Sequence, residues 1–102
     1  MAYLTPDPVR TVQATDFTGN YMAIGDPLAT DSLIIRVYNQ TNQPILFSFD
    51  GVNTTEFIDV GMVYELNCEP GVNAIQSGTQ FYVNGFAGPY NYGVVYLSVY
   101  HD

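Results

Sequence analysis

Short segments in which apolar and polar residues alternate recur along the whole chain, separated by stretches rich in Gly, Pro, Asn and Asp. Successive side chains of a β-strand point to opposite faces, so this alternation predicts strands with one face in a core. Nowhere do apolar residues keep a helical spacing over several turns. The pattern therefore predicts an all-β protein.

The three clearest strands span residues 32–38, 45–49 and 93–100. Their alternation gives each strand one face directed at the core and one directed away from it. The residues that we expect on the core side are Leu33, Ile35, Val37, Ile45, Phe47, Phe49, Val95, Leu97 and Val99. The other faces carry Arg36 and Tyr38 in the first strand and Tyr96 and Tyr100 in the last.

Weaker alternation predicts further strands over residues 9–14, 21–24, 55–60, 62–67 and 79–83. Turns are expected at 39–44, Asp50-Gly51, Gly61, 69–71, Asn84-Gly85 and 85–93, whereas residues 72–76 give no clear prediction. About eight short strands with turn signals roughly every ten residues predict two packed antiparallel sheets. We expect an antiparallel β-sandwich of the jelly-roll type or another Greek-key type.

The chain of 102 residues has the length of one domain. Residues 1–8 contain two prolines and few side chains that could pack, so we interpret them as an extended N-terminal arm. Residues 9–102 then form a single β-sandwich domain.

The charge of the chain is strongly acidic, because ten carboxylates face only two arginines and no lysine, for a net charge of −8. Nucleic-acid binding requires a positive surface that displaces counterions from phosphates, so binding of DNA or RNA is excluded. An anionic membrane surface would repel the chain as well. The acidity serves solubility, or it marks a surface that meets a basic partner.

Cys68 is the only cysteine, so we expect no internal disulfide and a buried, inert thiol. The first residues do not have the pattern of a secretion signal, and no apolar run reaches the length of a membrane helix. We therefore expect the protein to be made in a cytoplasm. Two matches to the glycosylation acceptor pattern, at Asn39 and Asn53, are interpreted as chance matches in turns.

Residues for catalysis or metal binding are scarce. His101 is the only histidine and the penultimate residue, which makes it a poor candidate for a positioned general base. One Cys and one His cannot form a zinc site. Calcium needs oxygen ligands, and Asp50, Asn53 and Glu56 share a hairpin loop, but this group fits a β-turn at least as well. We expect no enzyme activity, no cofactor and no bound metal.

Tyrosine is the most conspicuous residue, with nine copies in 102 residues. Tyrosine and arginine are enriched in protein interfaces, and lysine is depleted there. The candidate partner-binding residues are Arg36, Tyr38, Phe86, Tyr90, Tyr92, Tyr96 and Tyr100. The alternative is that these faces form a second buried layer.

Part of the sequence resembles small virion proteins of tailed bacteriophages. A strand ending in Asn39 is followed by a turn, by Ser-Phe-Asp-Gly at residues 48–51, and by a closing strand, Gly-Val-Val-Tyr-Leu-Ser-Val-Tyr, at residues 93–100. These motifs consist of turn and core residues, and they extend over about two thirds of the chain, without residues 1–30. The resemblance implies a β-sandwich that assembles onto a phage head, neck or tail.

The leading hypothesis is a non-enzymatic virion protein, most specifically a capsid decoration or cement protein that binds and stabilises the coat-protein shell. We expect it to form a closed homo-oligomer, with a trimer favoured. A neck, tail or fibre component is the alternative within the same class. A carbohydrate-binding module is the alternative from another class, with Tyr90 and Tyr92 as the platform for a sugar ring.

Overall fold

The structure is a computed structural model that describes residues 4–86 and 88–102. The elements found in these residues are β1 (Thr5–Pro6), β2 (Arg10–Gln13), the short 3-10 helix η1 (Ala14–Asp16), β3 (Met22–Ala23), β4 (Ile34–Thr41), β5 (Ile45–Ser48), β6 (Glu56–Ile58), β7 (Val63–Asn67), β8 (Tyr82–Gly85) and β9 (Gly93–His101). No helix in this part of the chain is long and apolar enough to cross a membrane.

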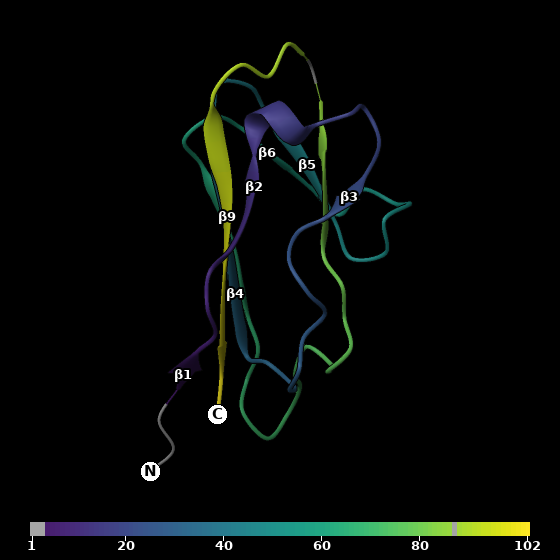
Figure 1. The fold of residues 1–102 in the computed structure, drawn as a ribbon. Coiled ribbons are helices and arrows are strands. Elements are labelled where there is room, and N and C mark those ends of the chain that lie inside the picture. The colour runs from purple at the N-terminus through teal and green to yellow at the C-terminus, as the bar shows by residue number, and fades with distance from the viewer. Residues whose placement is uncertain (1–3, 87) are drawn as a thin grey trace.

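The strands form two antiparallel sheets that pack face to face (Figure 1). Sheet A has the order β1-β9-β4-β7, with β2 also paired to β9, and sheet B has the order β3-β8-β5-β6. Within them β2 pairs with β9, β3 with β8, β4 with β7, and β5 with β6. This nested pairing of β2 to β9 is that of a long hairpin rolled up into two sheets, and β1 adds a fifth strand to sheet A. The fold is therefore an antiparallel β-sandwich, as the sequence predicts, and of the two types that the sequence left open it has the jelly-roll topology.

The core lies between the two sheets and consists of aromatic and branched aliphatic side chains. Phe47 of β5 stacks on Phe81, with ring centroids 5.7 Å apart. Eight of the nine core residues expected from the alternation are buried. The ninth, Phe49, is half-buried at the margin, where its ring contacts Phe47 and Phe81 edge-on. The period of two thus assigned the faces of β4, β5 and β9 correctly.

Two predicted turns are wrong in part. The turn expected at 39–44 begins only after Thr41, because β4 continues through Asn39 and stays paired with β9 along its whole length. Asn84 and Gly85 were expected to form a turn, but they are the end of β8 and pair with Leu46 and Ile45. In both cases pairing with a strand distant in sequence outweighs the local turn preference of Asn and Gly.

The N-terminal segment is extended and lies along the edge of β9 that faces away from β4. Residues 5–6 form β1, and the backbone amide of Asp7 donates to the carbonyl oxygen of Val99 at 2.9 Å. The Asp7 carboxylate lies 3.4 Å from Arg10 and 3.1 Å from Nε2 of His101. Residues 4–8 of the predicted arm are thus held against the domain, and residues 1–3 lie outside the described residues.

Candidate protein-binding surfaces

The residues predicted to bind a partner fall into two groups in the structure. Arg36 and Tyr38 of β4 share one face of sheet A with Tyr96 and Tyr100 of β9. The remaining three, Phe86, Tyr90 and Tyr92, belong to the loop of residues 86–92, which connects β8 to β9 in sequence.

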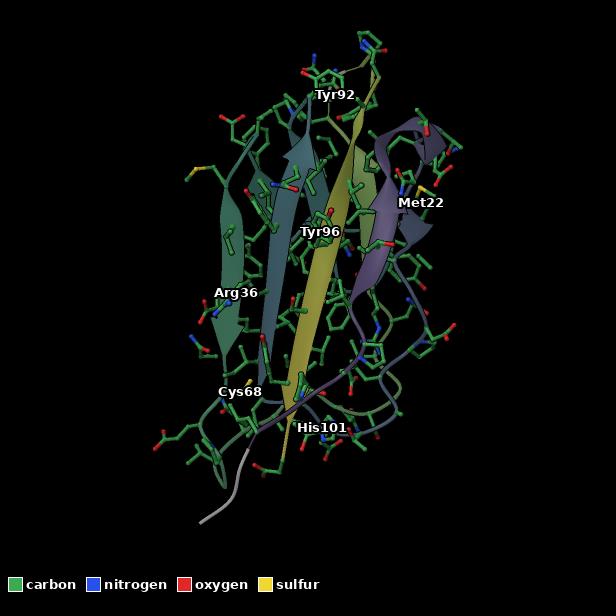
Figure 2. The ribbon with its side chains drawn as sticks, turned by 60° about the vertical axis from the view of Figure 1, so that its left-hand side comes forward. Met22, Arg36, Cys68, Tyr92, Tyr96 and His101 are labelled. Carbon is green, nitrogen blue, oxygen red and sulfur yellow. The ribbon has the colours of Figure 1, made fainter. Side chains whose placement is uncertain are left out.

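The outer face of sheet A is the face directed away from sheet B. Antiparallel partners share a face, so the strand register defines its members. They are Thr11 and Gln13 of β2, Val94, Tyr96, Ser98 and Tyr100 of β9, Ile34, Arg36, Tyr38 and Gln40 of β4, and Val63, Glu65 and Asn67 of β7. Figure 2 shows this face at the front, and neither a helix nor the second sheet covers it among the residues drawn.

Two tyrosines meet near the middle of this outer face. Tyr38 and Tyr96 are directly opposite each other on β4 and β9, with ring centroids 6.4 Å apart. The amide of Gln40 donates to the Tyr38 hydroxyl at 3.1 Å. These contacts fix the two rings as a pair, so both are half-buried without any partner. A fixed aromatic pair loses little conformational entropy when another surface covers it.

The only two charged side chains of the outer face compensate each other. Arg36 Nε donates to Glu65 Oε2 at 3.2 Å, and its Nη2 atom lies 3.1 Å from the same oxygen. Asn67 donates to the other oxygen of Glu65 at 2.9 Å. The hydrogen bond from Asn67, together with the Arg36 guanidinium, lowers the pKa of Glu65. The outer face of sheet A is therefore neutral in a chain of net charge −8.

The loop of residues 86–92 is held by two side chains. Asn42 donates to the carbonyl oxygen of Pro89 at 3.0 Å and accepts a hydrogen bond of 2.9 Å from the amide of Asn91. The hydroxyl of Tyr90 donates to the carbonyl oxygen of Pro44 and accepts a hydrogen bond of 2.6 Å from the amide of Phe86. Residues 86 and 88–92 of the loop are thus held onto the end of sheet B before any partner binds.

Tyr90 differs from the other two aromatic residues of this loop. Its ring packs against Phe17, with centroids 4.7 Å apart, and a Cβ atom on Gly85 would clash with it. Phe86 and Tyr92 are instead 60% and 69% exposed. Tyr90 therefore anchors the loop, and the two neighbouring rings are the ones presented to solvent.

An exposed aromatic pair that the sequence analysis did not identify lies on sheet B. The ring of Phe57, on edge strand β6, meets the ring of Phe86 edge-on, with centroids 5.0 Å apart. Leu46, the register partner of Phe57 on β5, is half-buried beside it. We call Leu46, Phe57 and Phe86 the aromatic patch. The sequence did carry a signal, because Phe57 and Ile58 are adjacent and only one of them can face the core.

The Asp50 group forms a closed turn. Asp50 Oδ1 accepts hydrogen bonds from the amides of Val52 and Asn53, both at 2.8 Å, and from the hydroxyl of Ser48 at 2.9 Å. The amide group of the Asn53 side chain donates to Oδ2 at 2.9 Å. These donors, led by the Asn53 amide, hold the pKa of Asp50 far below its ordinary value. The carboxylate is thus used by its own loop, as expected of a turn.

Asn39 has a structural role as well. Its side chain is fully buried, donates to the carbonyl oxygens of Gln43 and Ile58 at 3.0 Å, and accepts from Thr41. Asn53 is exposed, with its side chain bound to Asp50. Asn39 and the Ser-Phe-Asp-Gly motif of residues 48–51 therefore both stabilise loops.

Cys68 and His101 lie at the end of the sandwich where β4 begins and β9 ends. Cys68 is half-buried in a shallow hollow with Leu4 and Ile34, and its amide donates to the carbonyl oxygen of Leu33 at 2.7 Å. His101 is bound to Asp7. No group of three or more His, Cys, Asp or Glu side chains in residues 4–86 and 88–102 is placed to hold a metal ion.

Comparison with known protein families, with curated proteins and with solved structures found no match for this chain. Its surfaces therefore have to be interpreted from their own chemistry.

Proposed function

We propose that this chain is a non-enzymatic structural protein of a bacteriophage particle, a decoration protein that binds and stabilises the coat-protein shell. The motif resemblance over residues 33–60, 78–83 and 93–100 supports this assignment. Jelly rolls also serve as viral capsid domains, but the same fold hosts other functions, so the fold alone does not decide the role.

The observation that carries the proposal is the aromatic patch. Phe57 is 49% exposed and Phe86 60% exposed, and both come from backbone that hydrogen bonds hold in place. Large aromatic side chains contribute most to interface energy when they fill pockets on a partner. Exposed apolar groups of this size on a rigid support are typical of protein-binding sites. The patch would be the contact that buries most apolar area against a coat subunit.

Asn42 and Tyr90 also support the proposed binding role, because their hydrogen bonds order the loop of Phe86 and Tyr92 before a partner binds. A loop that is ordered before binding avoids the entropy cost of immobilisation at the interface. This favours a binding role for Phe86 and Tyr92 over a role for Tyr90, whose ring faces Phe17 and whose hydroxyl is bound to Pro44. Tyr90 and Tyr92 therefore do not form a common platform for a sugar ring.

A decoration protein stabilises the shell because its binding is coupled to the assembly of the coat subunits. A protein that binds the assembled shell and not the free coat subunits shifts the equilibrium towards the shell. Neutral or basic patches on the coat protein would suit the acidic remainder of this chain.

The experiment is co-sedimentation of the purified protein with phage coat-protein shells that lack it. We expect saturable binding, a loss of at least about tenfold in affinity for Phe86→Ser, and unchanged binding for Val72→Ser. Val72 is a matched control because it is 71% exposed and lies in the connection between β7 and β8, outside the aromatic patch. Protein that stays in the supernatant at every concentration would refute the decoration role. If it instead binds isolated necks or tails, the alternative of a neck, tail or fibre component replaces it.

A further inference from the structure

We infer that the outer face of sheet A is the surface through which two copies of this chain associate, packing sheet against sheet around a two-fold axis. This inference goes beyond the proposed function, since it concerns only the association of the chain with itself. It replaces the trimer favoured in the sequence analysis with a two-fold dimer, because the outer face is complementary to itself. It assigns Arg36, Tyr38, Tyr96 and Tyr100 to a dimer interface and leaves the aromatic patch accessible to the coat protein.

Charge identifies the second copy as the occupant. Two copies of net charge −8 repel each other, so they can approach only where carboxylates are absent or compensated. On the outer face the charges are Arg36 and Glu65, of opposite sign and 3.1 Å apart. Asp102 borders the face just beyond the end of β9. A basic partner would be attracted to the other surfaces, whereas the outer face of sheet A offers it no net charge.

The same two residues give the face the self-complementarity that a two-fold interface needs. In an isologous contact, residue i of one copy meets residue j of the other, and j meets i. Arg36 and Glu65 are both partly exposed, with 46% and 37% of their side chains accessible. Arg36 can keep its contact with Glu65 of the same copy and also contact Glu65 of the other copy, and the reverse holds for Glu65. With both contacts made, all four charged side chains of the interface are compensated.

The amino-acid composition of the outer face is also compatible with a protein interface. Three tyrosines and one arginine lie among Thr, Gln, Ser, Asn and aliphatic side chains, and lysine is absent from the chain. This is the composition of interface cores, in which Tyr and Arg are enriched and Lys is depleted. Tyr38 and Tyr96 are already paired, so little side-chain entropy is lost when a second copy covers them.

The size of the face is sufficient for a weak, reversible contact. Its strands β2, β9, β4 and β7 have 4, 9, 8 and 5 residues. At standard strand spacing and rise they form a flat surface of about 400 Å², so two copies cover about 800 Å² between them. This lies at the lower end of the range for protein interfaces, where reversible contacts are found. Sheets that pack face to face lie about 10 Å apart and accept aromatic side chains between them. The dimer would be a stack of four sheets.

The experiment is sedimentation velocity on the full chain over a range of concentrations, followed by exchange of charges. We expect the mass to approach twice 11.3 kDa. Arg36→Glu makes the face doubly negative and Glu65→Arg makes it doubly positive, so each variant alone should lose at least about tenfold in dimer affinity. An equimolar mixture of the two variants should restore the dimer, as a heterodimer.

The control is the double variant Val52→Glu/Val72→Glu. It changes the net charge by the same amount as Arg36→Glu, at two side chains that are 78% and 71% exposed and lie outside the face. Circular dichroism of each variant reports whether it is folded. A monomeric wild type at all concentrations, a trimer, or a dimer that Arg36→Glu leaves unchanged would overturn the inference. Failure of binding to coat shells would leave it standing.

Discussion

The side chain of Asn39, in sheet A, donates a hydrogen bond of 3.0 Å to the backbone carbonyl oxygen of Ile58, in sheet B. Asn39 is 0% exposed, and both of its polar side-chain atoms are bound. It thus joins the two layers at the end of the sandwich where β4 stops. A buried amide in this position stabilises one arrangement of the sheets, because any other would leave it without partners.

Replacing this residue should strongly destabilise the fold. We expect Asn39→Ala to lower the free energy of unfolding by about 3 kcal/mol, since the buried carbonyl of Ile58 and the amide of Thr41 lose their partner. For a domain of this size the unfolding temperature would fall by about 10 °C or more. Thermal unfolding followed by circular dichroism measures this fall in the unfolding temperature. Gln40→Ala, at the exposed neighbour on the same strand, should change it little, and equal effects of the two variants would contradict the role of Asn39.

Asp50 should make stability sensitive to acid. Its pKa in the folded protein is lowered by hydrogen bonds from the Asn53 and Val52 amides, so its carboxylate stabilises the fold above its ordinary pKa of 3.8. That contribution is lost as the pH falls below 3.8 towards the lower folded value. Asp50→Asn should therefore unfold at a lower temperature than wild type at neutral pH.

The difference in unfolding temperature between wild type and Asp50→Asn should narrow as the pH is lowered from about 5 to about 2. Asp16→Asn removes the same charge at an exposed position in η1 and serves as the control. A difference for Asp50→Asn that stays constant over this range would show that the charge of Asp50 does not stabilise its loop.

Tyr90 should control the order of the loop of residues 86–92. Tyr90→Phe keeps the ring against Phe17 but removes the hydroxyl bound by Pro44 and Phe86. We expect a loss of about 1 kcal/mol in the free energy of unfolding and faster hydrogen exchange at the Phe86 amide. Tyr92→Phe, at a ring that is 69% exposed, is the control. Unchanged exchange at the Phe86 amide in Tyr90→Phe would contradict the anchoring role.

Self-association should strengthen as salt is added. The acidic surfaces of two copies repel each other outside the neutral outer face of sheet A, and salt screens that repulsion. We expect the dimer dissociation constant to fall several-fold between about 0.05 M and 0.5 M NaCl. Sedimentation equilibrium at each salt concentration measures the constant. Weaker association at high salt would indicate that attraction between opposite charges, and not shape, drives the contact.

The faces of the long strands could be predicted from the sequence, because a period of two leaves only one way to bury Ile35, Val37, Val95 and Leu97. The pairing of strands could not, since β9 lies beside β4 through contacts between residues more than fifty positions apart. The predicted strand ends at residue 38, before β4 does, for the same reason: contacts with residues distant in sequence determine where β4 ends. Asn39 looks like a turn residue locally, but its hydrogen bond to Ile58 keeps it in the strand.

For the candidate surfaces, the sequence predicts which residue types they contain but not how these residues are arranged. The alternation puts Tyr38 and Tyr96 on the faces opposite the core residues of their strands, but it left open whether these faces are covered. The strand register places Tyr38 beside Tyr96. Nothing in the sequence indicated that Tyr90 would turn inward, because its anchor, the carbonyl oxygen of Pro44, is 46 positions away. Phe57 was overlooked because its neighbour Ile58 satisfied the strand pattern.

The most direct test of the proposed function is the heat stability of coat-protein shells with and without the bound protein. If the chain cements the shell, saturating protein should raise the temperature at which the shells come apart, and Val72→Ser should do the same. Phe86→Ser, at the same concentration, should give little or no increase. Shells that come apart at the same temperature with and without saturating bound protein would contradict the central claim.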